Sequence, residues 1–151
     1  MDHKIICKTM LYSYKDLEEQ CKSVDNLILR QAIASKNRST EEAFERIMDL
    51  TNEKIAYCNI KVIIDEAVAE MKNNAELKSY YILGWSIKKI EEQFNLLRQT
   101  LEWRLTKQRE ELYKIILSKH NGPELIEIMS DSWFLMKKYK EFKALEKRVK
   151  G

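Results

Sequence analysis

The sequence has few of the residues that interrupt helices. Its 151 residues include only three glycines and one proline, while leucine, isoleucine, lysine and glutamate are abundant. Glycine and proline are the least favourable residues inside a helix, and this composition is typical of a helical chain. We therefore predict an all-α protein in which a long N-terminal antiparallel helical hairpin precedes a helix-turn-helix domain and a C-terminal helix.

Cysteine is also scarce. There are three cysteines, an odd number: Cys7, Cys21 and Cys58. They lie far apart in the sequence, and none belongs to a C-x-x-C motif. This pattern excludes a disulfide framework and a cysteine zinc site of the usual spacing. We expect three reduced thiols at buried helix positions.

Long apolar runs are missing as well. No stretch approaches the roughly 20 apolar residues that a membrane-spanning helix needs. The first residues, Met-Asp-His-Lys, are not followed by an apolar run of signal-peptide length. We expect a cytoplasmic protein.

The charge is nearly balanced but unevenly distributed. The formal net charge is +3, from 27 basic and 24 acidic residues, which excludes a general polycation. Residues 41–72 carry eight acidic and four basic side chains, whereas residues 137–150 carry seven basic and two acidic ones. Separated charges of this kind favour a local nucleic-acid patch over nonspecific coating.

The N-terminal segment, residues 1–73, is predicted to form the hairpin. Residues 4–34 carry a heptad seam, and the polar residues 35–39 interrupt it. Ser39 followed by Glu42 is a capping box, so a second helix should begin there and continue to about Asn73. The seam of the first helix consists of Met10, Tyr14, Leu17, Cys21, Val24 and Ile28, and the predicted stripe of the second consists of Phe44, Ile47, Met48, Ile55, Cys58, Val62 and Met71.

Two long helices joined by a short polar loop form an antiparallel hairpin. This hairpin is too long for one small globule to cover its seam completely. We therefore expect it to associate with a second copy or with a partner helix, and we favour a homodimer.

Residues 84–112 have the spacing of a helix-turn-helix. Ile87, Ile90 and Phe94 recur on one helix face, and Ser86 stands where it can cap the first turn. Asn95 follows, and asparagine enters a left-handed turn at low cost. The inward face of the next helix is expected to consist of Leu97, Leu101, Leu105, Gln108 and Leu112.

The surrounding elements complete a unit that spans residues 74–121. Leu77, Tyr80, Tyr81 and Leu83 predict a short helix that supports the motif, and the second motif helix should continue to about Lys119. Asn121-Gly122 then stops it, and Pro123 suits the start of a further helix. The remaining segment, residues 122–151, should be a C-terminal helix with a basic end and a break near residues 130–132.

The outward face of the second motif helix carries side chains that suit DNA. Glutamine and arginine can bond base edges bidentately in the major groove, and lysine or arginine can neutralise phosphates. An ordinary solvated helix face has the same residue types, so the pattern alone leaves both interpretations open. The candidate DNA-binding residues are Ser86, Lys88, Lys89, Arg98, Gln99, Glu102, Trp103, Arg104, Thr106, Lys107 and Arg109.

Trp103 has two possible environments. It lies on the outward face, where it could stack on a base or contact a thymine methyl. It also lies at the edge of a possible contact with the C-terminal helix, and we favour this packed position over DNA contact. Trp85 and Trp133 are expected to be packing residues.

The run from Gly84 to Leu112 resembles the helix-turn-helix of bacterial sigma-factor region four. That family's pattern is roughly G-x-S-x-x-E-I-A-x-x-L-G-x-S-x-x-T-V-x-x-R-L-x-R-A-R-x-x-L. Phe94 and Leu101 are conservative replacements within it. The positions that match are Gly84, Ser86, Ile90, Thr100, Arg104, Leu105, Lys107, Arg109 and Leu112.

The resemblance implies a DNA-binding transcription regulator similar to small sigma-like proteins of phages and mobile elements. It implies double-stranded DNA as a partner, with RNA polymerase as a further possible one. Arg98, Gln99, Glu102, Thr106 and Lys107 would approach bases, while Ser86, Lys88, Lys89, Arg104 and Arg109 would hold the DNA backbone. Only about 30 residues carry the specific resemblance, and three positions depart from it: Glu91, Asn95 and Leu97.

A second interpretation is a helical interaction or inhibitor protein that uses the helix-turn-helix only for packing. Glu91 and Glu102 add negative charge near the DNA, and Leu97 replaces the usual capping serine. The two interpretations differ in whether the basic side chains of residues 88–109 form one continuous positive face.

Catalytic and metal-binding patterns are weak. The carboxylates Asp65, Glu66 and Glu70 cluster on the second helix, but no histidine follows a glutamate at metal-ligand spacing. Neither His3 nor His120 has a nucleophile placed beside it by the sequence, and no glycine-rich phosphate loop occurs. We expect neither an enzyme nor a metal or other cofactor.

Overall fold

The computed structural model describes residues 3–34 and 39–150. Every regular element in this part of the chain is helical, and the predicted all-α fold is confirmed. The elements are α1 (His3–Ala34), α2 (Thr40–Glu70), α3 (Ala75–Leu77), the π-helical turn η2 (Lys78–Ile82), α4 (Ile87–Phe94), α5 (Arg98–Lys119), α6 (Gly122–Ser130) and α7 (Trp133–Lys150).

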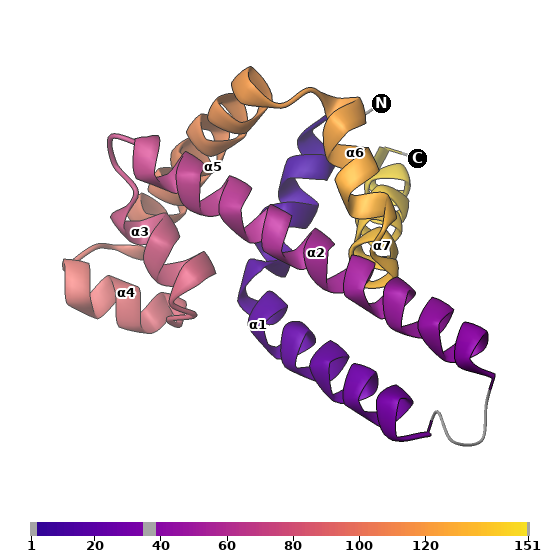
Figure 1. Ribbon diagram of the computed structural model, residues 1–151. Helices are drawn as coiled ribbons and strands as arrows, with labels where there is room; N and C mark the ends of the chain where they lie inside the picture. Colours follow the sequence, from indigo (N-terminus) through magenta and orange to yellow (C-terminus); the bar gives the residue numbers. More distant parts are fainter. Residues whose placement is uncertain (1–2, 35–38, 151) are drawn as a thin grey trace.

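The long helices α1 and α2 pack antiparallel, as predicted (Figure 1). The hydroxyl of Tyr14 donates a hydrogen bond of 2.6 Å to Asp65 across the pair. Lys54 donates one of 2.7 Å to Asp25 nearer the C-terminal end of α1. Two bonds at different levels fix the register of the hairpin.

Ser39 caps α2, because its Oγ accepts a hydrogen bond of 3.2 Å from the backbone N–H of Glu42. This confirms where the second helix begins. The predicted polar break at residues 35–39 lies, apart from Ser39, outside the described residues. At the other end α2 stops at Glu70, shortly before the predicted Asn73.

The apolar stripe predicted for the second helix is wrong. Of its members only Met71 is buried, while Phe44, Met48, Ile55, Cys58 and Val62 are exposed. Helix α2 has apolar residues on two opposite faces, and periodicity alone does not distinguish them. The buried face includes small alanines, which let the neighbouring helices approach closely, and it consists of Ala43, Ala56, Tyr57, Ile60, Ile63, Ile64, Ala67 and Val68.

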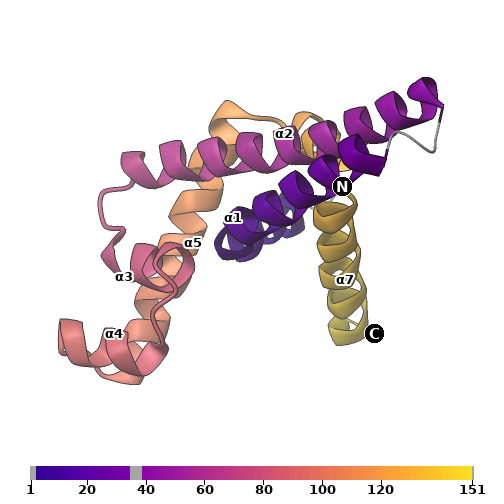
Figure 2. The same ribbon diagram turned by 60° about the horizontal axis from the view of Figure 1, so that its bottom comes forward.

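The core lies around the first half of α1. Ile6, Met10 and Leu11 are fully buried there, and α1 contacts α2, η2, α5, α6 and α7. The ends of α1 and α2 nearest residues 35–38 project away from the other helices (Figures 1 and 2). We call residues 25–34 and 40–51 the arm.

The C-terminal segment breaks as predicted, since α6 ends at Ser130 and α7 begins at Trp133. An unpredicted carboxylate caps α7 from another helix. Buried Glu53 of α2 accepts hydrogen bonds from the Ser132 hydroxyl at 2.8 Å and from the N–H groups of Trp133 and Phe134 at 2.9 and 3.3 Å. A negative charge at this position satisfies free N–H groups and complements the helix dipole.

Two further expectations need correction. Cys7 is buried and Cys21 is half-buried, but Cys58 is exposed, so its predicted burial is wrong. The Trp133 side chain is 62% exposed and contributes less to packing than expected. Both residues are accessible to solvent at the surface of their helices.

None of the helices in the described ranges is long and apolar enough to cross a membrane.

Candidate nucleic-acid interface

The predicted helix-turn-helix is present as α4, a tight turn and α5. Ser86 caps α4, since its Oγ accepts a hydrogen bond of 3.1 Å from the Lys89 N–H. Asn95 ends α4 in the left-handed conformation, with φ 52° and ψ 53°. Helix α5 then begins at Arg98. The cap, the left-handed turn and the start of the second helix agree with the sequence-based prediction.

The inward face of α5 contains four of the five predicted residues. Leu101, Leu105, Gln108 and Leu112 are buried, but the predicted burial of Leu97 is wrong because 79% of it is exposed. Leu97 is the N-cap residue and has extended backbone angles, with φ −72° and ψ 150°. The helical phase that places Leu101 inward therefore does not extend back to it.

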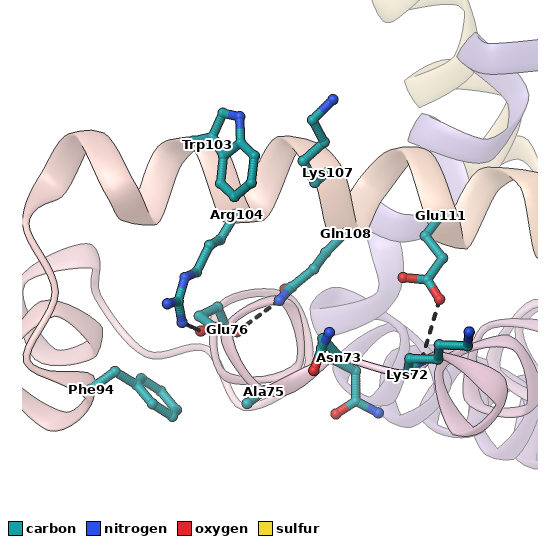
Figure 3. Close-up of a pocket in the computed structure, with 11 residues that line it drawn as sticks. Lys72, Asn73, Ala75, Glu76, Phe94, Trp103, Arg104, Lys107, Gln108 and Glu111 are labelled. Carbon is teal, nitrogen blue, oxygen red and sulfur yellow. Dashed lines mark hydrogen bonds and ion pairs between the residues drawn. The ribbon is translucent and has the colours of Figure 1, made fainter.

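A group of hydrogen bonds holds α5 against the supporting helix α3 (Figure 3). The Gln108 amide donates a 2.7 Å hydrogen bond to the buried Glu76 carboxylate and accepts a 2.8 Å bond from the Leu77 N–H. Arg104 donates to the other Glu76 oxygen at 2.9 Å. These bonds connect residues about 30 positions apart and fix how α5 sits on its support.

Two opposing effects determine the pKa of the Glu76 carboxyl group. Burial would raise its pKa, but the hydrogen bonds from Gln108 and Arg104 outweigh burial and leave the pKa lowered. Glu76 therefore remains ionised near neutral pH, and its charge is balanced by Arg104.

Two predicted phosphate-binding arginines form hydrogen bonds with other side chains of the protein. Arg104 pairs with Glu76, and Arg109 donates to the Tyr81 hydroxyl at 3.0 Å and to Thr106 Oγ1 at 3.1 Å. Their guanidinium groups brace α5 against α3 and η2. The sequence predicts their place on this helix but contains no local signal for their partners, which lie 28 residues away.

The outer face of the first half of α5 is open. Gln99, Glu102, Thr106 and Lys107 are exposed, and the Trp103 side chain is 61% exposed. The favoured packing of Trp103 against the C-terminal helix is therefore wrong. Helix α7 lies against α1, away from this end of α5 (Figure 2).

Acidic residues interrupt the positive charge on this face. Arg98 is paired with Glu102 at 3.2 Å, and Lys107 lies 3.8 Å from Glu110. All four side chains are more than half exposed, so each pair contributes little stability and can open. The surface is thus one of mixed charge rather than a continuous positive face.

The start of α4 forms the other edge of this surface. Ser86, Lys88 and Lys89 are exposed there. Lys89 lies over the half-buried Trp85 ring, with its Nζ 4.3 Å from the ring centroid. Trp85 therefore packs as expected, and the lysines remain close to the helix N-terminus.

A groove of about 600 Å³ runs between α5 and the chain leading into α3. Trp103 and Lys107 line it from α5, while Lys72 and Asn73 line it from the opposite side (Figure 3). In the described ranges, no group of three or more His, Cys, Asp and Glu side chains is arranged to hold a metal ion.

No known protein family matches the chain, and no curated protein or solved structure shows a significant similarity to it.

Proposed function

We propose that this protein is a cytoplasmic, sequence-specific DNA-binding transcription regulator that inserts the first half of α5 into the major groove. The observation that carries the proposal concerns the two faces of α5. Hydrogen bonds hold its inner face against the rest of the protein, while its outer face is exposed to solvent. Gln108 and Arg104 hold the inner side, while Gln99, Trp103 and Thr106 remain exposed. A rigid helix that presents polar and aromatic side chains suits base readout.

Roles on the outer face follow from side-chain chemistry. Arg98 and Gln99 lie at the start of α5, the part of a recognition helix that contacts base edges. Glu102 can accept a hydrogen bond from a cytosine amino group, and Trp103 offers apolar contact to a thymine methyl. Opening of the exposed Arg98–Glu102 pair would free both groups to bind DNA.

We assign contacts with the DNA backbone to the residues at the start of α4. Ser86, Lys88 and Lys89 lie together at a helix N-terminus, where the backbone dipole favours a phosphate. For Arg104 and Arg109 the sequence predicts phosphate contacts. Their bonds to Glu76 and Tyr81 support a positioning role instead, and we assign them that role.

Selection from a pool of random DNA duplexes at near-physiological salt tests this proposal. Sequencing of the retained fraction should reveal an enriched motif, because base contacts discriminate among sequences whereas phosphate contacts do not. Binding without enrichment, or no binding at all, would contradict base readout by α5.

We further propose that the regulator binds as a homodimer through the arm. Leu29 and Ile33 of α1 and Phe44 and Met48 of α2 are exposed there, far from the core. Closed two-fold dimers are the commonest oligomers, and dimeric helix-turn-helix proteins place two recognition helices about one DNA turn, roughly 34 Å, apart. RNA polymerase is the alternative occupant of this surface, as the resemblance to sigma factors implies.

The apolar arm and the interrupted positive face also favour a second candidate function. In it the protein acts through protein contacts alone, and the helix-turn-helix serves only for packing. A chain that enriches no DNA motif but self-associates or binds RNA polymerase through the arm would support this alternative.

A further inference from the structure

Cys21 on α1 and Cys58 on α2 lie at the same level of the hairpin. Cys21 is seven residues beyond Tyr14, and Cys58 is seven residues before its partner Asp65. Counted from the other bond, Cys21 is four residues before Asp25 and Cys58 is four residues beyond Lys54. In an antiparallel helix pair, equal steps from a shared contact lead to facing residues. The two cross-helix bonds therefore place the two thiols opposite each other.

The surroundings of Cys21 agree with this register. Burial raises the pKa of the Cys21 thiol, and the neighbouring Cys58 raises it further, while Lys54 and Lys61 oppose the increase. Positions 54, 58 and 61 follow one another at helical spacing along one side of α2, so they surround a side chain that inserts from α1.

The three thiols differ in accessibility. Cys58 is exposed, Cys21 is half-buried, and Cys7 is fully buried in the core. Burial raises the pKa of Cys7 to about 12, so it is almost entirely protonated at neutral pH. Cys58 is thus the thiol that a reagent in solution reaches first, and Cys21 is the neighbour placed to react with it.

We propose that Cys21 and Cys58 are a redox-active pair, which forms a disulfide between α1 and α2 when a small disulfide such as oxidised glutathione supplies the oxidising equivalents. The Cys58 thiolate attacks one sulfur of oxidised glutathione, which forms a mixed disulfide and releases one glutathione thiolate. The Cys21 thiolate then attacks the Cys58 sulfur and displaces the second glutathione thiolate. Overall, two protein thiols are oxidised and one small disulfide is reduced to two thiols.

The cross-link has a mechanical consequence. It joins the helices between the Tyr14–Asp65 and Asp25–Lys54 bonds, at the point where the arm leaves the rest of the protein. A disulfide there restricts the unfolded chain and holds the base of the arm closed. Oxidation should therefore stabilise the fold without using any residue of the α4–α5 surface.

The test uses the full-length protein and oxidised glutathione. After incubation, denaturation and alkylation with N-ethylmaleimide, intact mass spectrometry should show one alkylated cysteine and the loss of about 2 Da. The thermal midpoint should rise by roughly 5 °C or more, and dithiothreitol should reverse the change. The Cys7→Ser variant should form the same cross-link, which a peptide map would assign to residues 21 and 58.

Cys21→Ser and Cys58→Ser are the matched controls, and neither should gain thermal stability on oxidation. Three alkylated cysteines in the oxidised wild type would overturn the proposal. A stable glutathione adduct on Cys58, or a disulfide-linked dimer through Cys58 in place of the internal cross-link, would overturn it as well.

Discussion

Gln108 and Glu76 form the central link between the helix-turn-helix and its support. The Gln108 amide donates to the Glu76 carboxylate at 2.7 Å, and its oxygen accepts from the neighbouring Leu77 N–H at 2.8 Å. Both side chains are buried, with only 5% of each residue exposed. A single amide thus satisfies one backbone donor and one buried carboxylate at once.

Replacement of Gln108 by leucine should destabilise the protein by about 1–3 kcal/mol, because two buried partners lose a hydrogen bond. Urea unfolding followed by circular dichroism measures this change. Gln93→Leu is the matched control, since Gln93 is exposed on α4 and its replacement should change stability by less than about 0.5 kcal/mol. Equal effects of the two substitutions would contradict a special role for Gln108.

Stability at acid pH should depend on Glu76. Its folded-state pKa is lowered from the ordinary value of 4.5, so ionised Glu76 contributes stability above that value. The contribution is lost as pH falls through the lowered folded-state pKa. The difference in unfolding free energy between wild type and Glu76→Gln should therefore be largest near neutral pH and shrink below about pH 4.5. A difference that stays constant from pH 7 to pH 3 would contradict this assignment.

Local signals in the sequence predict the elements well. Ser39, Ser86 and Asn95 act on neighbouring backbone groups, so their effects do not depend on the rest of the fold. The regular burial of Leu101 and Leu105 is equally local, because helical geometry alone places them on one face. For these reasons the helix-turn-helix could be predicted from residue spacing.

The choice of packing face could not be predicted in the same way. Phe44 and Ile55 are larger and more apolar than Ala56 or Ala67, yet the alanine side of α2 is buried. Which face packs depends on the shape of α1 and of the later helices, and no short window contains that information. The bond from Arg104 to Glu76 was hidden for the same reason, since its partners are distant in sequence.

The cap from Glu53 to α7 leads to another prediction. Glu53→Gln keeps the size of the side chain but removes the charge that accepts bonds from Ser132, Trp133 and Phe134. Hydrogen bonds to a charged group contribute about 1.5–3 kcal/mol, and a loss in this range is expected in chemical unfolding. The exposed Asp49→Asn, one turn earlier on α2, should have almost no effect. Similar losses in both variants would argue against the cap.

Base readout by α5 predicts a change in discrimination between DNA sequences. Gln99→Ala should weaken binding to a selected motif by about 1–3 kcal/mol while leaving binding to random DNA nearly unchanged. Lys88→Ala should weaken both, because it is assigned to phosphate. Fluorescence anisotropy with the two duplexes measures each effect. If the Gln99→Ala variant kept the wild-type ratio of affinity for the selected motif to affinity for random DNA, the proposal that Gln99 contacts bases would be wrong.

The exposed arm predicts a concentration-dependent dimer. Phe44 is 62% exposed and Met48 is 43% exposed, one helical turn apart on α2. Burial of apolar surface drives association, and a charge placed within such an interface opposes it. Sedimentation velocity should show the wild type as a dimer and the Phe44→Glu, Met48→Glu double variant as a monomer.

Val149→Glu is the control for this experiment. Val149 is an apolar residue on α7 that is 87% exposed and lies away from the arm, so this variant should remain dimeric. The double variant should keep the wild-type circular dichroism spectrum, since neither side chain belongs to the core. A wild type that sediments as a monomer at high concentration would exclude the second copy, and the apolar surface of the arm would then be assigned to a different protein.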